Sequence, residues 1–330
     1  MPSNRNIVLE PRTYPIRGIF RISRGAKTQS DAVVVRITED GATGLGECIP
    51  YARYGETVAS VLQQLESVSG RIREGLDLDG LQQALPPGSA RNALDCALWD
   101  LRSRLTGQTV ADYAGLQQPL APVTTAFTLS LDTPEAMAAV ARERADLPLL
   151  KLKLGGDGDL ERVRAVRAAA PRARLMADAN ESWSPHHLRL FLPAFAELGV
   201  ELLEQPLPAG QDDTLLDYQS PVSLAADESC RDLRSLADIR RKYAIANIKL
   251  DKTGGLTEAL ALADAAEQAG MRVMVGCMVA SSLSMAPGLV LAQRADVVHL
   301  DGPMLLAADC EPGLRYQGAV VSPDARVWSV

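Results

Sequence analysis

The spacing of hydrophobic and polar residues divides the chain into two parts that meet near residue 120. Short apolar runs between Asn6 and Glu47 predict strands, of which Ala32–Thr38 is the strongest. Apolar residues at helical spacing then predict helices over about 56–74 and 89–105. Strands followed by helices indicate an α+β module for the first 120 residues.

From Val123 onward, short apolar strands alternate with alanine-rich amphipathic helices in units of roughly 22 to 28 residues, which is typical of repeated βα units. The predicted strands are Thr124–Leu129, Leu149–Leu154, Arg174–Ala177, Val200–Leu203, Ser223–Ala226, Ile245–Leu250, Arg272–Gly276 and Val297–Leu300. Eight strands with helices between them predict the α/β class and a (β/α)8-type barrel. A doubly wound open sheet is the alternative, although no glycine-rich dinucleotide turn is present. The tail from Glu311 onward is strand-like and is expected to return to the N-terminal module.

The second strand of this series, LLKLKLGG from Leu149 to Gly156, carries the first sign of chemistry. Alternation with a period of two places Lys151 and Lys153 on one face and leucines on the other. In a closed barrel one face points into the interior, where an ammonium group is unfavourable unless anions or a metal-bound substrate compensate it. A buried-strand lysine is also often part of a structural ion pair, so this strand alone is weak evidence.

Charged residues also stand at the carboxyl ends of the next four strands, where barrels of this type build their active sites. Asp178, Glu204 and Asp227 follow the third, fourth and fifth strands, and Lys249 follows the sixth. Three carboxylates with oxygen-only ligands suit a hard divalent ion, most simply Mg²⁺, with Mn²⁺ as an alternative. A lone aspartate at a strand end is more often a helix cap, but this joint occurrence would rarely arise from packing alone.

This arrangement predicts proton transfer at the carbon next to a carboxylate. A metal would clamp the substrate carboxylate and stabilise the enediolate that forms when the neighbouring carbon loses its proton. Lysines on opposite faces of that carbon would act as base and acid, which predicts 1,1-proton transfer by a racemase or epimerase. Burial and nearby cations lower a lysine pKa whereas carboxylates raise it, so the net shift stays open at this point.

Composition and charge argue against several other classes of protein. The net charge of −7, with no basic run and only 4% aromatic residues, argues against nucleic acid as the main partner. The most apolar window, Val273–Leu291, contains serines, glycines and a proline, so we interpret it as a buried strand and helix rather than a membrane span. The N-terminus lacks the features of a signal peptide, and five scattered cysteines without a CxxC motif indicate reduced thiols in a cytoplasmic protein.

A set of motifs in this order resembles a known family. The chain contains KLKLGG, MADANESW, LEQPLPA, ADESC, NIKLDKTGGLTEAL and GCMVASS, with GECIPYARYGE and ARNALDCALWD nearer the N-terminus. The set is similar to that of the enolase superfamily, muconate-lactonising subgroup, and within it to the dipeptide epimerases that act on L-Ala-D-Glu and L-Ala-L-Glu from cell-wall peptide. The resemblance covers essentially the whole chain. It implies a capping domain over 1–120, joined by the tail 311–330, above a barrel domain over 121–310.

The resemblance also implies roles for individual residues. Lys153 and Lys249 correspond to the two acid/base lysines, and Lys151 to the family's lysine that helps neutralise the enediolate. The family's Mg²⁺ ligands correspond to Asp178, Glu204 and Asp227. Arg24 matches the capping-loop position that meets the glutamyl side-chain carboxylate. It lies in Ser23–Ser30, a polar segment with the composition of a mobile loop.

The eighth strand departs from the family pattern. Dipeptide epimerases usually carry Asp-x-Asp there to hold the substrate's α-ammonium, and this chain keeps Asp301 but has His299 at the first position. A neutral histidine could accept a hydrogen bond, whereas a protonated one would repel an ammonium group. His299 is therefore either a tolerated replacement or a sign of a changed substrate. Cys277 and Met278, after the seventh strand, are expected to line the substrate pocket, with Cys277 as a packing group rather than a nucleophile.

The preferred hypothesis is a cytoplasmic, Mg²⁺-dependent dipeptide epimerase, an isomerase acting on a small dipeptide. An N-acylamino acid racemase or o-succinylbenzoate synthase would share the lysines and carboxylates; Asp301 favours a free amine and His299 is the feature against it. A non-catalytic, metal-dependent ligand-binding protein is the third hypothesis, but its signature would be loss of Lys153 or Lys249. No nucleic acid or membrane partner is expected, and a homo-oligomer is suggested by analogy alone.

Overall fold

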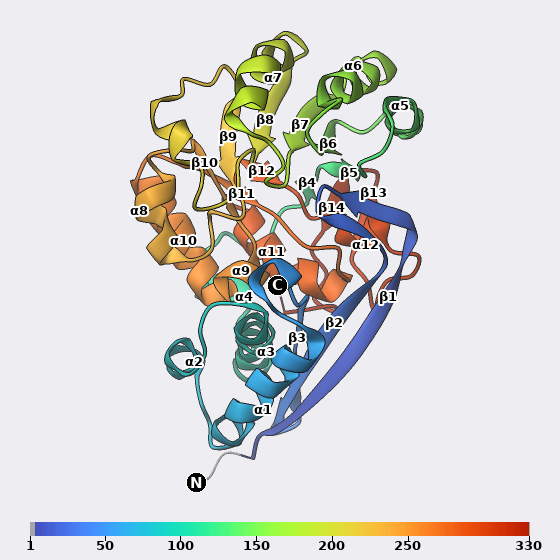
Figure 1. Ribbon diagram of the computed structural model, residues 1–330. Helices are drawn as coiled ribbons and strands as arrows, with labels where there is room; N and C mark the ends of the chain where they lie inside the picture. Colours follow the sequence, from blue (N-terminus) through green and yellow to red (C-terminus); the bar gives the residue numbers. More distant parts are fainter. Residues whose placement is uncertain (1–3, 330) are drawn as a thin grey trace.

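A computed structural model describes residues 4–329 and shows two parts in contact (Figure 1). The N-terminal part, blue to cyan in the figure, is an antiparallel sheet of strand order β1-β2-β3 with helices packed against it. Its elements are β1 (Asn6–Ile22), β2 (Gly25–Glu39), β3 (Ala42–Cys48), η1 (Ala52–Tyr54), α1 (Val58–Arg73), α2 (Leu78–Ala84), α3 (Ser89–Thr106) and α4 (Val110–Tyr113). The two predicted helices of this part correspond to α1 and α3.

Two glycines on β3 allow helix α3 to approach the sheet closely. A Cβ atom at Gly44 would lie 2.1 Å from the carbonyl oxygen of Ala97, and one at Gly46 would lie 2.1 Å from that of Ala93. Any larger residue would therefore overlap the helix backbone. This contact fixes α3, which is buried along most of its length, between the sheet and the second part of the molecule.

The second part is a parallel barrel, green to red in Figure 1. Its eight strands are neighbours in chain order, and the backbone N–H of Ala126 donates to the carbonyl of Val298 at 2.9 Å, so the first and last strands meet. The strands are β5 (Phe127–Leu129), β6 (Leu149–Lys153), β7 (Arg174–Asp178), β8 (Val200–Glu204), β9 (Ser223–Ala226), β10 (Ile245–Ile248), β11 (Arg272–Val275) and β12 (Val297–Val298). The predicted α/β class and barrel architecture are confirmed.

Helices of unequal length cover the outside of the barrel. They are α5 (Pro134–Glu143), α6 (Asp159–Ala169), α7 (Pro185–Glu197), η2 (Asp213–Asp217), η3 (Leu233–Ser235), α8 (Leu236–Ile239), α9 (Leu250–Thr253), α10 (Leu256–Gln268), α11 (Ser282–Ala292) and α12 (Gly302–Leu305). The regular alternation predicted from the sequence is interrupted between β8 and β9, which are joined only by the short η2. The segment QPLPAGQDD precedes it, and its prolines and glycine disfavour a longer helix.

The interior of the barrel has an apolar floor below a polar layer. The floor is formed by Ala126, Leu149, Met176, Leu202, Ala225, Ile245, Met274 and Val297. Because strand side chains alternate, the residue two positions later in each strand points into the same interior, one layer nearer the carboxyl ends. These residues are Thr128, Lys151, Asp178, Glu204, Asp227, Asn247, Gly276 and His299. The alternation of each strand therefore places Lys151, His299 and the three predicted metal ligands directly above an apolar floor.

Strands β1 and β2 form a long ribbon whose tip rests on the barrel (Figure 1). Ile22 pairs with Gly25, so only two residues form the turn at the tip. The prediction of a loop over Ser23–Ser30 is therefore wrong for most of that segment, because its polar residues belong to an exposed strand. The hydroxyl of Ser23 donates to the carbonyl of Asn180 at 2.9 Å, which places the tip at the carboxyl end of β7.

Buried carboxylates hold the N-terminal part against the barrel. Glu47 on β3 accepts hydrogen bonds from the backbone N–H and the hydroxyl of Ser281, at 3.0 and 2.7 Å. Asp251 in α9 accepts hydrogen bonds from the N–H of Ile49 and the side-chain amide of Asn92, each at 2.9 Å. Because hydrogen bonds in a buried interface are directional, they fix how the two parts are oriented relative to each other.

The C-terminal residues contact both parts. Strands β13 (Arg315–Gln317) and β14 (Val320–Ser322) pair with β4 (Val123–Thr124) in a separate sheet rather than with β1–β3. Beyond β14, the indole N–H of Trp328 donates to the carbonyl of Leu45 at 3.0 Å, so the chain end reaches the N-terminal part. We propose two domains, as the sequence suggests. Residues 1–120 and the tail 311–330 form the first, and residues 121–310 form the second.

The most apolar stretch of the chain, 273–291, belongs to the barrel wall. It comprises most of β11 and α11, and nearly all of its residues in these elements are buried. Within residues 4–329, no helix combines the length and the apolar character that crossing a membrane requires.

Candidate active site

Three carboxylates meet at the carboxyl ends of neighbouring strands. Asp178 and Glu204 are the last residues of β7 and β8, and Asp227 directly follows β9. One oxygen of each lies within 4.8 Å of the others, and all three side chains are fully buried. Carboxylates this close repel one another unless positive charge compensates them. The fold therefore brings the three predicted metal ligands into one cluster.

The predicted lysines supply positive charge to this cluster. The pairs, with their Nζ–O distances, are Lys151–Glu204 (2.5 Å), Lys153–Asp178 (2.6 Å) and Lys249–Asp227 (2.6 Å). Lys153 ends β6 and Lys249 follows β10, and the strands that carry the carboxylates lie between them. The two lysines therefore approach the cluster from opposite sides.

Pairing outweighs burial in setting the charge of Lys151, Lys249 and Asp227. Glu204 differs, because burial and the nearby charge of Asp178 raise its pKa to about 7. Burial by itself lowers the pKa of Lys249, but the carboxylates of Asp227 and Glu204 raise it well above its ordinary value. The pKa of Lys151 is raised in the same way, against the effect of burial. Burial also opposes ionisation of Asp227, yet Lys249 and Lys252 hold its pKa well below the usual range. The balance that the sequence left open thus favours the charged form of Lys151 and of Lys249 in this arrangement.

Two further residues complete the buried network, and sequence reasoning did not identify them. Lys252 Nζ lies 2.6 Å from Asp227 Oδ1 and 3.0 Å from the backbone oxygen of Asn247. The Asn247 amide donates to Glu204 Oε1 at 2.8 Å. Lys252 lies one helical turn beyond Lys249, so the i,i+3 spacing in the motif KLDK was the available signal.

The cluster has the chemistry of a divalent metal site. It offers only carboxylate oxygens, which are the ligands that Mg²⁺ prefers in proteins. The side-chain oxygens of Asn180 and Asn247 are buried without a hydrogen-bond partner among the described residues. Asn180 follows Asp178 by two positions and Asn247 contacts Glu204, so unused polar oxygens adjoin the cluster. The donor set therefore fits a hard dication.

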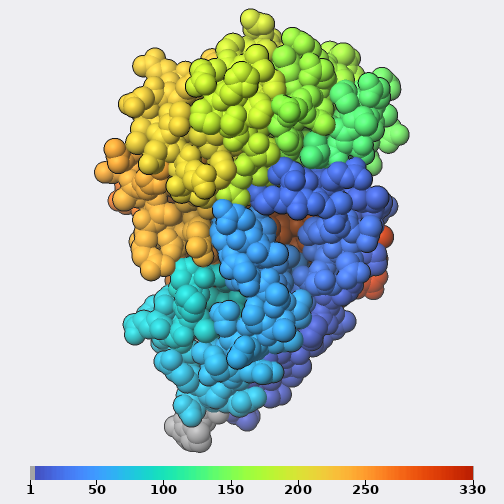
Figure 2. Space-filling view, in the orientation of Figure 1, coloured from blue at the N-terminus to red at the C-terminus, as the bar shows by residue number. Residues whose placement is uncertain are grey.

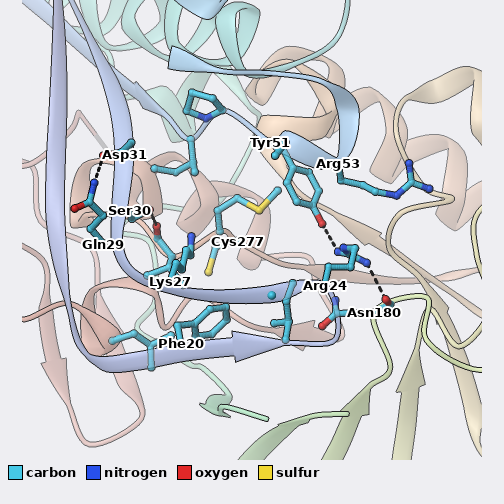
Figure 3. A pocket seen from close by; sticks show the side chains of 18 of the residues that line it. Phe20, Arg24, Lys27, Gln29, Ser30, Asp31, Tyr51, Arg53, Asn180 and Cys277 are labelled. Carbon is cyan, nitrogen blue, oxygen red and sulfur yellow. Dashed lines mark hydrogen bonds between the residues drawn. The ribbon is translucent and has the colours of Figure 1, made fainter. Parts of the chain in front are cut away.

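A pocket of about 800 Å³ lies between the N-terminal part and the barrel (Figure 3). This volume suits a small-molecule ligand. In the space-filling view, the blue N-terminal segments cover the barrel and leave an opening through which orange atoms are visible (Figure 2). The predicted substrate-binding residues all line the pocket; they are Arg24, Cys277, Met278, His299 and Asp301. Lys153 and Lys249 also line it, whereas Lys151 and the three carboxylates do not.

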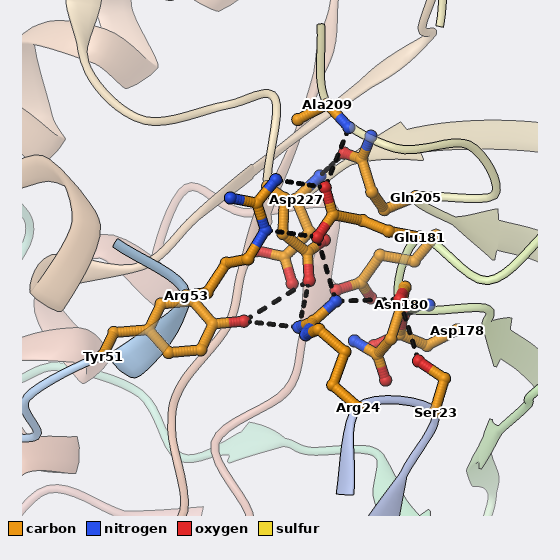
Figure 4. A network of polar contacts seen from close by, with 12 residues as sticks. Ser23, Arg24, Tyr51, Arg53, Asp178, Asn180, Glu181, Gln205, Ala209 and Asp227 are labelled. Atoms are coloured by element: carbon orange, nitrogen blue, oxygen red, sulfur yellow. Dashed lines mark hydrogen bonds and ion pairs between the residues drawn. The ribbon is translucent and has the colours of Figure 1, made fainter. Parts of the chain in front are cut away.

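Arg24 joins the tip of the ribbon to the barrel (Figure 4). Its Nη2 lies 2.6 Å from Glu228 Oε1, and its Nη1 lies 3.1 Å from Glu181 Oε2. The guanidinium also donates to the backbone oxygen of Asn180 at 2.8 Å and to the hydroxyl of Tyr51 at 2.7 Å. Arg24 thus lines the pocket, but its donors are directed at other protein groups.

His299 and Asp301 form a connected group at the end of the eighth barrel strand. His299 Nε2 lies 3.0 Å from Asp301 Oδ1 and 2.8 Å from the Thr128 hydroxyl, and Asp301 Oδ2 accepts from the Thr128 N–H at 2.7 Å. Burial and the charge of Lys151, whose Nζ lies 3.3 Å from His299 Nδ1, lower the pKa of His299 to about 4. The imidazole is therefore neutral near pH 7, and Asp301 is the acidic side chain of this pair.

Cys277 and Met278 contribute to the wall of the pocket beside the end of β11. Burial raises the pKa of Cys277 to about 12, so its thiol stays protonated near neutral pH. Because the thiolate is the reactive form of cysteine, this supports a packing role for Cys277 rather than a nucleophilic one.

Two protein-family models match most of the chain. The model of the mandelate racemase / muconate lactonizing enzyme N-terminal domain matches residues 5–115, and the enolase C-terminal domain-like model matches residues 135–317. The chain is 44% identical to the L-Ala-D/L-Glu epimerase of Escherichia coli (strain K12), covering 94% of this chain and 98% of that one. It is 41% identical to an N-acetyl-D-glutamate racemase of a Pseudoalteromonas species, covering 88% and 92%.

Solved structures show the same similarity. An enolase family member from Agrobacterium tumefaciens with homology to dipeptide epimerases, crystallised with sodium and L-Ala-L-Glu, is 47% identical with a TM-score of 0.96, covering 98% of this chain and 99% of that one. A dipeptide epimerase from Enterococcus faecalis, in complex with Mg and L-Leu-L-Tyr, is 26% identical with a TM-score of 0.89 and covers 98% of each chain.

We expect Lys252→Met to lower the free energy of unfolding by roughly 3 to 5 kcal/mol, because removal of one buried partner leaves Asp227 and the Asn247 carbonyl with unmet polar atoms. Arg174→Met is the matched control, since it breaks the exposed ion pair with Glu201 and should cost about 1 kcal/mol or less. Urea denaturation followed by circular dichroism measures both changes. Equal losses in the two variants would contradict a structural role for Lys252 in the buried network.

Proposed function

The chain belongs to the mandelate racemase / muconate lactonizing enzyme family of the enolase superfamily, and on this basis we propose that it is a metal-dependent dipeptide epimerase. This isomerase inverts the α-carbon of the glutamyl residue in L-Ala-D-Glu and L-Ala-L-Glu. One observation carries the proposal: Lys153 and Lys249 line one pocket and approach three clustered carboxylates from opposite sides. The name of the Escherichia coli relative and the L-Ala-L-Glu bound to the Agrobacterium tumefaciens relative support the choice of dipeptide.

The metal site is assigned to the carboxylate cluster. Asp178, Glu204 and Asp227 would hold Mg²⁺, with Mn²⁺ as the alternative ion. The bound ion supplies positive charge that stabilises the substrate carboxylate as negative charge develops on it. Because the cluster is buried above an apolar floor, its charges act in a medium of low dielectric and reorganise little during the reaction.

The lysines move the protons. The neutral Nζ of one of Lys153 and Lys249 takes the α-proton from one face of the substrate, and the ammonium group of the other donates a proton to the opposite face. The configuration inverts because the proton leaves on one side and returns on the other. Lys151, which lies 3.2 Å from Asp178 and 2.5 Å from Glu204, stays charged and stabilises negative charge on the substrate carboxylate.

The biological setting follows from the substrate. A dipeptide of this composition is a fragment of cell-wall peptide, so we propose a role in the recycling of peptidoglycan peptides in the cytoplasm. The net charge of −7 supports a small-molecule partner rather than nucleic acid. We retain a homo-oligomer as part of the proposal by analogy with related barrels.

A second candidate function is the racemisation of an N-acylated amino acid. The observation in its favour is the eighth strand, where the neutral His299 lies 3.0 Å from Asp301 Oδ1 and leaves Asp301 as the acidic residue of the pair. The acyl group of such a substrate carries no charge where a dipeptide has its α-ammonium group, so it needs less negative potential from the pocket. The Pseudoalteromonas relative that is named an N-acetyl-D-glutamate racemase supports this alternative.

Proton exchange in D₂O tests the proposed function. With Mg²⁺ and L-Ala-L-Glu, we expect the glutamyl α-proton signal in NMR spectra to disappear while the L-Ala-D-Glu epimer accumulates. Treatment with a chelator should abolish both changes and added Mg²⁺ should restore them, because the carboxylate cluster supplies the metal ligands. Exchange that continues in metal-free protein would contradict the assigned metal site.

Single-lysine variants test the assignment of the two faces. In Lys153→Met and Lys249→Met we expect epimerisation to fall by a factor on the order of 10² to 10⁴ or more, since each variant lacks one proton-transfer group. Each variant should still exchange the α-proton of one epimer, with the two variants acting on opposite epimers. NMR of L-Ala-L-Glu and L-Ala-D-Glu in D₂O, recorded separately, distinguishes these cases. Loss of the same epimer's exchange in both variants would reject a two-face mechanism.

Comparison of L-Ala-L-Glu with N-acetyl-L-glutamate separates the two candidate functions. We expect a higher kcat/KM for the dipeptide, and the reverse order would select the second candidate. His299→Asp should shift the ratio of the two kcat/KM values toward the dipeptide by about tenfold, because a second carboxylate would face the α-ammonium group. His299→Asn adds no charge and is the control. If both variants shift the ratio equally, the charge at this position does not set the preference.

A further inference from the structure

Five cationic side chains line the pocket, and four of them are paired with a carboxylate. The paired residues are Arg24, Arg53, Lys153 and Lys249. The fifth is Lys27 on β2, which forms no ion pair or hydrogen bond with any of residues 4–329. Its ammonium group lies 5.8 Å from the centroid of the Phe20 ring, and Figure 3 shows both side chains at the pocket.

The surroundings of Lys27 favour an anionic ligand. Burial lowers the pKa of Lys27 and the charge of Lys153 lowers it further, whereas Asp31 opposes both effects. No ion pair joins Asp31 to Lys27 within residues 4–329, and the Oδ1 of Asp31 accepts hydrogen bonds from Thr13 at 2.8 Å and Gln29 at 3.0 Å. An ammonium group that is partly removed from water and lacks a counterion gains stability when an anion binds beside it.

The guanidinium group of Arg24 already forms ion pairs with protein carboxylates. Its partner Glu228 has a fully buried side chain, at 0% exposure, and a movement of Arg24 toward a ligand would leave that carboxylate without its cation. Arg24 also pairs with Glu181, which Arg53 holds at 2.6 Å on the same side of the pocket (Figure 4). We therefore treat Arg24 as a positioning residue that fixes the ribbon tip on the barrel.

We propose that Lys27 binds the anionic side chain of the residue whose α-carbon reacts, so that the enzyme selects dipeptides with an acidic C-terminal residue. This inference rests on the proposed function and deepens it. Lys27 shares one pocket with Lys153 and Lys249, so a substrate whose α-carbon lies between those lysines can direct its side chain toward Lys27. The family resemblance implies that Arg24 contacts the glutamyl side-chain carboxylate. We assign this contact to Lys27 instead, three positions further along the same ribbon.

Equilibrium binding tests this role independently of turnover. Calorimetry with the Mg²⁺-loaded protein compares L-Ala-L-Glu with L-Ala-L-Gln, which differ at the side-chain terminus in charge but hardly in shape. In Lys27→Met we expect the Kd of L-Ala-L-Glu to rise about 10- to 100-fold and the preference over L-Ala-L-Gln to disappear, whereas Lys27→Arg keeps the preference. Arg36→Met is the matched control, because it removes a positive charge from the same strand outside the pocket.

A charge reversal gives a readout that misfolding cannot produce. Lys27→Glu should bind L-Ala-L-Lys more tightly than the unmodified protein does, because the introduced carboxylate attracts the ammonium side chain. Equal loss of both dipeptides in Lys27→Met, or loss of the glutamyl preference in Arg24→Met alone, would overturn the inference. Exchange of the α-proton in D₂O is recorded in parallel. If exchange is absent while the binding preference still depends on Lys27, the proposed function fails, and only the role of Lys27 in binding the anionic side chain is retained.

Discussion

The balance of buried charge at the carboxyl ends of the barrel strands is the constraint on which the rest of the structure depends. Asp178, Glu204 and Asp227 would each be unfavourable in a dry interior, and so would the lysines that face them. Together they form short ion pairs above an apolar floor, which keeps the local dielectric low and each interaction strong. The residues that make the site reactive are therefore also the residues whose mutual pairing makes their burial tolerable.

The two parts of the molecule contribute different groups to the pocket. The barrel supplies the lysines and the proposed metal ligands at its strand ends, whereas the N-terminal part closes the pocket with its ribbon and with the segment that follows β3. Directed hydrogen bonds from Ser281 to Glu47, and from Ile49 to Asp251, set the relative orientation of the two parts. This arrangement lets substrate preference change on the ribbon or the eighth strand without disturbing the groups that transfer protons.

Local patterns were enough to predict most of the fold and the positions of the candidate catalytic groups at strand ends. The period-two alternation in LLKLKLGG placed Lys151 and Lys153 on one face, and the repeat of strand and helix placed Asp178, Glu204 and Asp227 at successive strand ends. Such features depend on neighbours in the chain, so they can be recognised without knowledge of tertiary contacts. The segment Ser23–Ser30 was mispredicted because polar composition reflects exposure, and an exposed strand of a ribbon is as polar as a loop.

The sequence by itself thus determined the order of the elements, the face on which each strand residue lies, and the chemical types present at the strand ends. Tertiary structure alone decided which of these groups are paired. Arg24 pairs with Glu228, Lys252 pairs with Asp227, and Lys27 has no anionic partner among the described residues. These outcomes, and the direction of each pKa shift, depend on distances between residues from different strands. Packing sets those distances, and a pattern read along one strand contains no information about them.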